Sequence, residues 1–327
     1  MIKPLMSKLF VLTLAGCLLG IFSVHAQKVL DKVQQNYKGI ESLRIEGGFC
    51  DVAIDGQSRD NVDFEGVIQG RFFGSGDFKI IHKKEGTLLH VWIDRPRIST
   101  GNIEGKLVFE VPSTVNVNVV NSSGDVKIEG IKKTPMKVKA SSGDIYLERN
   151  QCDLIFGTSS GDLIIKEHKG QLEGVSSSGD QQFWDIQGDI KTKASSGDVS
   201  FARIDGNINS GTTSGDVNFK DVKGDVSNVS SSGEIYLRNC EGSFSLRASS
   251  GDIDGRGITL RKNSKFRTSS GDITMDFSNS LESISFDLVA SSGDLQIGNR
   301  SAEKRMEKQS GEISVNGVSS SGDQRYY

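Results

Sequence analysis

The sequence has 327 residues, of which 25% are charged and 35% hydrophobic, and its formal charge is −3 from 39 basic and 42 acidic residues. This composition is typical of a folded, soluble protein and argues against a disordered chain. The slight excess of acidic residues argues against a nucleic acid as partner, because proteins that bind such polyanions are usually basic.

The first 26 residues have the organisation of a secretory signal peptide. Lys3 and Lys8 precede an apolar run over 9–24, and small residues around Ala26 offer a cleavage site. The run is shorter than the roughly 20 residues that span a bilayer. We therefore expect export to the periplasm, the outer-membrane surface or the extracellular space, with cleavage after Ala26.

A lipid anchor is the alternative for this segment. Leu14-Ala15-Gly16-Cys17 resembles a bacterial lipobox, in which Cys17 would become the lipidated first residue, although mostly apolar residues follow it. Because no second apolar span follows, we expect that the mature chain does not cross a membrane.

Residues 27–121 alternate between apolar and polar residues without an exact period, and they predict an irregular β cap with the first coils of a larger array. Gly74-Ser75-Gly76-Asp77 resembles a degenerate copy of the tetrapeptide that recurs later in the chain. Hairpins, including one over 78–93, are expected to cover the end of the array, since an open sheet edge invites pairing with other chains.

Residues 122–298 repeat the tetrapeptide Ser-Ser-Gly-Asp at intervals of 18 to 22 residues, mostly 18. Helical repeats need about 30 residues or more, so this period favours one coil of a β-solenoid. The motif glycines are Gly124, Gly143, Gly161, Gly179, Gly197, Gly215, Gly233, Gly251, Gly271, Gly293 and Gly311. The sequence therefore predicts an all-β, β-helix-like solenoid of about ten coils with β-hairpin caps at both ends.

Two apolar columns follow each tetrapeptide. When positions are counted from its first Ser, places five and seven are mostly apolar, as in Leu163 and Ile165, which predicts a strand with that face inward. A left-handed helix of hexapeptide repeats would also have 18 residues per coil. That fold needs an apolar residue at every sixth position, but here Lys169 and Asp205 occupy positions that would have to be apolar. We therefore favour a flattened two-sheet coil or an irregular one.

The tetrapeptide itself is interpreted as a stacked corner. A second alternating strand, such as Met136-Val138-Ala140, steps down to small residues, so the second Ser is expected to point into a narrow interior edge. Gly would supply the bend through a positive φ, and Asp would point outward. The residues assigned to this corner are Ser142, Gly143, Asp144, Ser160, Gly161, Asp162, Ser178, Gly179, Asp180, Ser196, Gly197 and Asp198.

Residues 299–327 are expected to close the far end. The charged stretch 300–308 interrupts the pattern, and Asn316-Gly317 within 313–318 predicts a hairpin turn.

The SSGD columns and the preceding VPSTVNVNVVNSSGDVKI carry a resemblance that covers the chain from about Ile40 onward. The chain resembles the bacterial family of "putative adhesins" with SSGD repeats, a domain of unknown function, and is similar to the head GIN domain of auto-transporter adhesins. The resemblance implies a β-solenoid protein of the cell envelope, and it supplies no catalytic residues.

The aspartates of the corners form a column of like charges, which repel one another unless something offsets the repulsion. Hydrogen bonds from the corner's own amides and hydroxyls are the first explanation, and a row of calcium ions is the second. The calcium-binding GGxGxDxUx nonapeptide is absent from the sequence. We expect no cofactor, with calcium as the minor alternative.

Other motifs are weaker. Gly157-Thr158-Ser159-Ser160-Gly161 matches the GxSxG nucleophile elbow, but neighbouring repeats carry the same Ser without the first Gly, so we interpret the match as coincidence. Cys50, Cys152 and Cys240 have neither disulfide nor zinc spacing and are expected to be buried free thiols. No catalytic or metal site is predicted.

The expected function is a non-enzymatic, exported envelope protein that presents solenoid faces to a glycan, a protein or another copy of itself. The candidate binding face consists of outward residues after the corners, namely Tyr146, Ile164, Trp184 and Tyr236, because exposed aromatic side chains stack on sugars or anchor protein contacts. The alternative is a carbohydrate-active enzyme, a polysaccharide lyase or hydrolase on the same scaffold.

Overall fold

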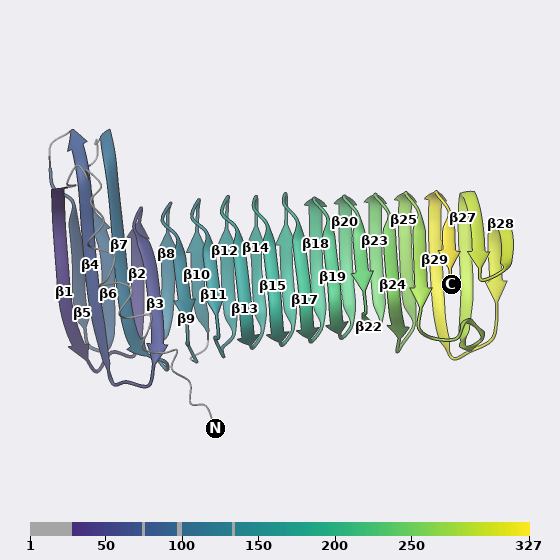
Figure 1. The fold of residues 1–327 in the computed structure, drawn as a ribbon, viewed down its shortest axis with the longest axis horizontal. Helices are drawn as coiled ribbons and strands as arrows, with labels where there is room; N and C mark the ends of the chain where they lie inside the picture. Colours follow the sequence, from purple (N-terminus) through teal and green to yellow (C-terminus); the bar gives the residue numbers. More distant parts are fainter. Residues whose placement is uncertain (1–27, 74–75, 97–99, 133–134) are drawn as a thin grey trace, which may run out of the picture.

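The computed structural model describes residues 28–73, 76–96, 100–132 and 135–327. The expected signal peptide and the alternative anchor at Cys17 lie outside these residues. In the described part, thirty strands and one short 3₁₀ turn, η1 (Leu281–Ser283), form a long rod, which confirms the predicted all-β solenoid (Figure 1).

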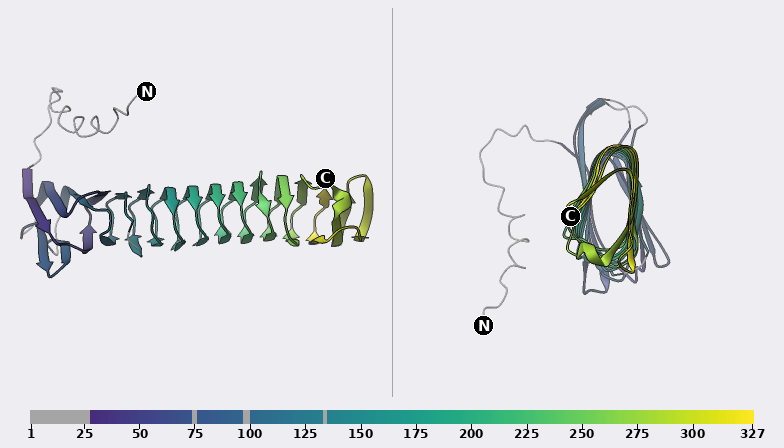
Figure 2. Two further views of the ribbon diagram at one scale, coloured as in Figure 1. Left: turned by 90° about the horizontal axis from the view of Figure 1, so that it is seen from below. Right: turned by 90° about the vertical axis from the view of Figure 1, so that its right-hand side faces the viewer.

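Each regular coil contributes one strand to each of two sheets. Sheet I holds the strand that follows each SSGD corner, and sheet II holds the strand that precedes it. Viewed along the rod, the two sheets form the long sides of a flattened oval (Figure 2). The predicted flattened two-sheet coil is therefore correct.

Strands of sheet I in the regular region pair in parallel, each with the strand one coil away. They are β9 (Val126–Glu129), β11 (Ile145–Glu148), β13 (Leu163–Lys169), β15 (Gln181–Gln187), β17 (Val199–Asp205), β19 (Val217–Lys223), β21 (Ile235–Arg238), β24 (Ile253–Leu260) and β26 (Ile273–Phe277), with the short β22 (Glu241–Gly242) beside β19 and β24.

Strands of sheet II follow the same rule. They are β8 (Asn116–Asn121), β10 (Met136–Ala140), β12 (Leu154–Thr158), β14 (Leu172–Ser176), β16 (Ile190–Ala194), β18 (Ile208–Ser214), β20 (Val226–Ser232), β23 (Phe244–Ser250) and β25 (Ser264–Ser270).

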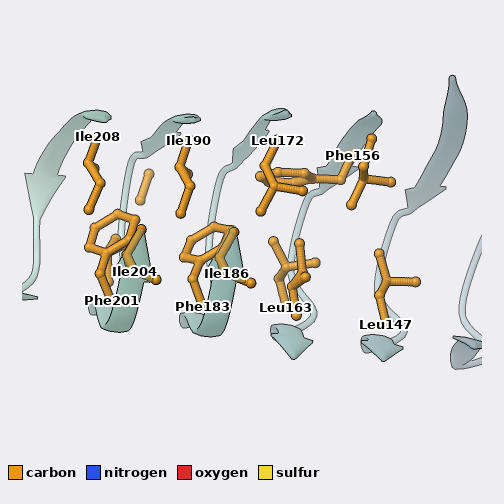
Figure 3. Packing of buried hydrophobic residues seen from close by; sticks show 14 of the residues in the cluster. Leu147, Phe156, Leu163, Leu172, Phe183, Ile186, Ile190, Phe201, Ile204 and Ile208 are labelled. Atoms are coloured by element: carbon orange, nitrogen blue, oxygen red, sulfur yellow. The ribbon is translucent and has the colours of Figure 1, made fainter. Parts of the chain in front are cut away.

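The core fills the narrow space between the sheets with the apolar columns that the sequence predicts. Places five and seven are buried in coil after coil, and Figure 3 shows Leu163, Phe183 and Phe201 among the side chains that meet those of sheet II. The rings of Phe183, Phe201 and Phe219 stack along the rod with centroids 5.1 and 5.0 Å apart. Identical side chains at one-coil spacing thus pack against one another as well as across the core.

Several inward positions are polar, and Gln181 shows how such a side chain is satisfied. Gln181 is fully buried at place five, where it donates through Nε2 to the backbone oxygen of Lys193 and accepts a hydrogen bond from Thr192 Oγ1. Both polar groups of the amide are therefore satisfied inside the core.

The N-terminal cap is formed by β1 (Lys28–Lys38), β2 (Ser42–Gly48), β3 (Asp51–Gln57), β4 (Asn61–Phe73), β5 (Lys79–Glu85), β6 (Leu88–Asp94) and β7 (Thr100–Pro112). The antiparallel pair β5/β6 confirms the hairpin expected over 78–93. Strands β2 and β3 form a coil that lies between β8/β9 and the later-numbered β6/β7. The antiparallel strands β4 and β1 extend sheet I beyond β7.

At the C-terminal end the prediction of a hairpin over 313–318 is wrong. Strand β29 (Ile313–Ser321) is continuous and pairs in parallel with β25 on one side and with β27 (Ile284–Ile297) on the other. Strand β30 (Gln324–Tyr326) likewise lies between β26 and β27. Within the predicted cap of 299–327, only β28 (Arg300–Lys308) closes the end, as an antiparallel partner of β27.

This insertion also corrects the last member of the repeat. Gly311 is not a corner glycine, because it lies beside Ser283 before β29 begins. Gly322 takes that role: its position stacks on Gly271, and Asp323 follows it in the aspartate column. The last coil of the sequence, formed by β29 and β30, therefore lies within the rod, between β25/β26 and β27.

Candidate functional site

The SSGD corner differs from the prediction in the direction of its serines. Ser142, Ser160, Ser178 and Ser196 are exposed, so the prediction that the second Ser points inward is wrong. The residue before the tetrapeptide, for example Thr158, points inward instead. Thr158 Oγ1 donates to the backbone oxygen of Gly161 and accepts from its N–H at 3.1 and 3.2 Å. The alternation of the strand therefore ends one residue earlier than expected.

Close stacking explains the corner glycines together with backbone freedom. The predicted positive φ is found at Gly179 and Gly197, with φ of 107° and 101°, and at the later corner glycines, but not at Gly143 or Gly161. A Cβ at Gly161 would lie 2.1 Å from the backbone oxygen of Gly143 in the preceding coil. Because no side-chain atom fits at this distance, glycine is required at the corner whether or not φ is positive.

The aspartates of the corner form a hydrogen-bonded ladder. Oδ1 of Asp144 accepts a hydrogen bond from the backbone N–H of Asp162 at 2.8 Å, and Asp162 accepts in the same way from Asp180, and Asp180 from Asp198. The donor is therefore an amide of the next coil, whereas the sequence predicted amides and hydroxyls of the same corner. Among the described residues, no three His, Cys, Asp or Glu side chains converge as metal ligands would.

Three members of the predicted binding face lie together on sheet I. Tyr146 and Ile164 are in register on β11 and β13, and Trp184 is a diagonal neighbour on β15. We call these three residues the aromatic patch. Tyr236 lies three coils beyond Trp184, on β21, between Asn218 and Asp254, so it does not join the patch.

Cations cover the rings of the aromatic patch. Lys127 and Lys166 lie with Nζ 5.8 and 5.5 Å from the centroid of the Tyr146 ring, and Arg203 lies 5.4 Å from that of Trp184. Arg203 also forms a two-point ion pair with Asp185 and holds the pKa of that carboxyl below its usual value. A partner therefore meets half-buried rings and cations together.

A shallow groove of about 460 Å³ crosses successive coils where the strands of sheet II begin. Glu173, Asp189 and Asp225 lie along it. Asp189 and Asp225 accept backbone hydrogen bonds from the next coil, and Glu173 pairs with Lys191 at 2.6 Å. Lys262 lowers the pKa of Asp225, which is the opposite of what a general acid requires.

The thiols and the buried imidazole show no sign of a reactive centre. Cys50, Cys152 and Cys240 are free and buried, as the sequence predicts, and burial raises the pKa of the Cys152 thiol to about 12. His168 Nε2 lies 2.7 Å from the backbone oxygen of Cys152, and burial lowers the pKa of His168 to about 4. The Ser159 hydroxyl of the GxSxG match is exposed at a corner that recurs along the rod.

The sequence interpretation missed the outward residues of sheet II. In the strands that precede each corner, outward residues alternate with buried residues, as they do in sheet I. This alternation could have identified them from the sequence. Among the described residues, none belongs to a helix of the length and apolar character needed to cross a membrane.

Solved structures similar to this chain include a "putative adhesin" from Parabacteroides merdae (11% identity, 90% of this chain and 96% of that chain covered, TM-score 0.33). They also include a "putative lipid binding protein" from Parabacteroides distasonis (12%, 90% and 96%, 0.30) and a "putative cell adhesion protein" from Clostridium sporogenes (11%, 91% and 99%, 0.19).

No curated protein matches the chain. The family model described as Toastrack DUF4097 matches residues 8–187 and 166–326, which together span nearly the whole sequence. The chain therefore belongs to the Toastrack DUF4097 family.

Proposed function

We propose that this protein is a non-enzymatic binding scaffold of the bacterial envelope, exported and held outside the cytoplasm, whose sheet I presents the aromatic patch to a glycan or a protein. The observation that carries the proposal is the grouping of Tyr146, Ile164 and Trp184 on three successive coils of one flat sheet. Rigid parallel pairing on both sides fixes their spacing before any partner arrives, which lowers the entropic cost of binding.

The chemistry of the patch suits an adhesive contact. Half-buried rings supply apolar area, while Lys127, Lys166 and Arg203 supply charged donors at their margins. Buried aromatic and Arg side chains dominate the energetics of many interfaces. Trp184 Nε1 is shielded from solvent and has no hydrogen-bond partner among the described residues, so the ring contributes through its apolar surface rather than as a donor.

The test is binding of the purified chain to arrays of glycans and host proteins, followed by substitution. Tyr146→Ala with Trp184→Ala should weaken binding of any captured partner by about 30-fold, the size typical of a hot spot. Tyr236→Ala is the matched control, because Tyr236 occupies the same place on sheet I outside the patch. An equal loss in the control, or turnover of a polysaccharide by the wild-type chain, would refute the proposal, and the second result would favour the enzyme alternative.

A further inference from the structure

The outward side chains of sheet II between β8 and β25 are strongly basic. Their cations are Lys137, Lys139, Lys191, Lys193, Arg247, Lys265 and Arg267, against the single acid Glu173. All of these side chains are exposed. We call the seven cations and the aliphatic residues between them the basic face.

This charge separation is a property of one sheet, not of the solenoid. On sheet I from β9 to β26, the outward side chains at places six and eight carry nearly equal numbers of positive and negative charges. These places hold the cations Lys127, Lys166, Lys220, Arg238 and Arg256 and the acids Glu129, Glu148, Asp254 and Asp276. A chain with a formal charge of −3 thus concentrates positive charge on one of its two long faces.

Most cations of the basic face have no acidic partner. Lys191 pairs with Glu173, but the other six cations form no ion pair with any described residue. Arg247 and Arg267 lie directly opposite each other on the adjacent strands β23 and β25, and like charges in this position oppose folding rather than favour it. An anionic partner from outside the chain would offset this repulsion.

The same face carries exposed aliphatic side chains. Val120, Ile155, Val175 and Val229 are 47%, 40%, 55% and 53% exposed, and they alternate along the rod with the cations. Gly157 and Gly211 occupy further outward places, where a Cβ would meet no atom closer than about 3.6 Å. The face is therefore low, flat and partly apolar, and it extends about 34 Å from β10 to β25 at a strand spacing of about 4.8 Å.

We propose that the basic face lies flat on an anionic lipid surface. Lys and Arg side chains would reach the phosphates while the aliphatic side chains between them rest in the headgroup region. A linear polyanion would need charges along one track, whereas these cations lie in two columns on β10, β16, β23 and β25, with apolar side chains on strands between them. In this orientation sheet I and its aromatic patch face away from the lipid, so the inference is independent of the proposed function.

Binding of the chain, as purified from the cells that express it, to vesicles tests the proposal. Affinity should be high for vesicles with about 30% phosphatidylglycerol, low for pure phosphatidylcholine, and should fall as salt rises. Lys193→Gln with Arg247→Gln should weaken binding to the anionic vesicles about 25-fold, since each cation near such a surface contributes about fivefold. The matched control is Lys220→Gln with Arg238→Gln, which removes one Lys and one Arg from sheet I and should change affinity less than twofold.

A second pair of substitutions tests the apolar part of the contact. Val175→Gln with Val229→Gln should weaken vesicle binding while leaving its salt dependence unchanged. Equal losses in the target and control variants would overturn the proposal, as would equal binding to neutral vesicles. Tighter binding per charge to a soluble anionic polysaccharide than to the vesicles would also overturn it and would assign the basic face to a polymer instead. Since thermal unfolding reports whether each variant is folded, a loss of structure is distinguished from a loss of binding.

Discussion

The carboxylate Oδ1 of Asp162 accepts a hydrogen bond of 2.8 Å from the backbone N–H of Asp180, its counterpart one coil later. The same contact recurs between Asp144 and Asp162 and between Asp180 and Asp198. Each aspartate thus ties two coils together at their corner, which offsets the repulsion between neighbouring carboxylates.

Two substitutions of a ladder aspartate should distinguish the effect of its hydrogen bond on stability from the effect of its charge. Asp162→Ala removes the acceptor for the Asp180 amide and should lower the free energy of unfolding by about 1 kcal/mol, because the site is exposed and water replaces part of the bond. Asp162→Asn keeps an acceptor, as Asn207 does naturally toward the amide of Asp225 at 2.9 Å, and should be at least as stable as the wild type. Urea unfolding measures both variants. If Asp162→Asn were as unstable as Asp162→Ala, the hydrogen bond would not be the stabilising feature.

Calcium removal gives a separate prediction for the same ladder. Calcium takes six to eight oxygen ligands, whereas the ladder oxygen Oδ1 of each aspartate already accepts an amide N–H. The melting temperature should therefore be the same in EDTA and in millimolar calcium. A fall of several degrees on adding EDTA, reversed by calcium, would show that the ladder is a metal site.

Two glycines of one coil should respond oppositely to the same substitution. Gly161→Ala places a Cβ 2.1 Å from the backbone oxygen of Gly143 and should cost at least about 2 kcal/mol, since neither backbone can move without breaking the stack. Gly157→Ala is the control, because its Cβ would find no atom closer than 3.8 Å. Its stability should equal or exceed that of the wild type. Thermal unfolding of the two variants checks this, and similar melting temperatures would contradict the stacking explanation.

A column of non-glycine residues with left-handed backbone offers a stabilising substitution. Glu167 has φ of 50°, and Arg149, Asp185, Arg203, Asp221 and Asn239 occupy the same place in other coils with φ between 54° and 57°. A side chain in this region costs about 1 kcal/mol or more, so Glu167→Gly should raise the free energy of unfolding by about 0.5–1 kcal/mol. Lys220→Gly, in the extended backbone of β19, should lower it by a similar amount. Loss of stability in Glu167→Gly would mean that the Glu167 side chain makes a larger contribution than its backbone strain.

The buried imidazole of His168 should make the protein sensitive to acid. Burial lowers the pKa of His168 from 6.5 to about 4, so the folded state binds a proton less readily than the unfolded state. The stability contributed by neutral His168 is complete above about pH 6.5 and is lost as the pH falls toward 4, by about 3 kcal/mol at most. His168→Ile reproduces the neighbours Ile186 and Ile204 in the same buried column and should reduce this loss. Chemical denaturation at pH 7 and pH 4.5 measures the difference, and an unchanged pH dependence would exclude His168 as the cause.

The sequence was sufficient to establish the regular part of the fold. An 18-residue period fixes one coil, and the alternation at places five and seven fixes which side chains face inward, because a strand that stacks on identical copies keeps the same register from coil to coil. The aromatic candidates followed from the same alternation, which is why Tyr146, Ile164 and Trp184 are found outward on adjacent strands.

Only the tertiary structure decided what breaks the repeat. Local alternation could not show that the corner turns after Thr158 and leaves Ser160 outside, because the turn is held by hydrogen bonds between coils, such as that from the backbone N–H of Ser160 to the backbone oxygen of Ser141. Sequence order could not place β29 between β25 and β27, since any coil edge offers the same backbone donors and acceptors to an arriving strand. The basic face likewise becomes visible only when residues 18 positions apart are stacked, because charge dispersed along the chain becomes a surface only through the fold.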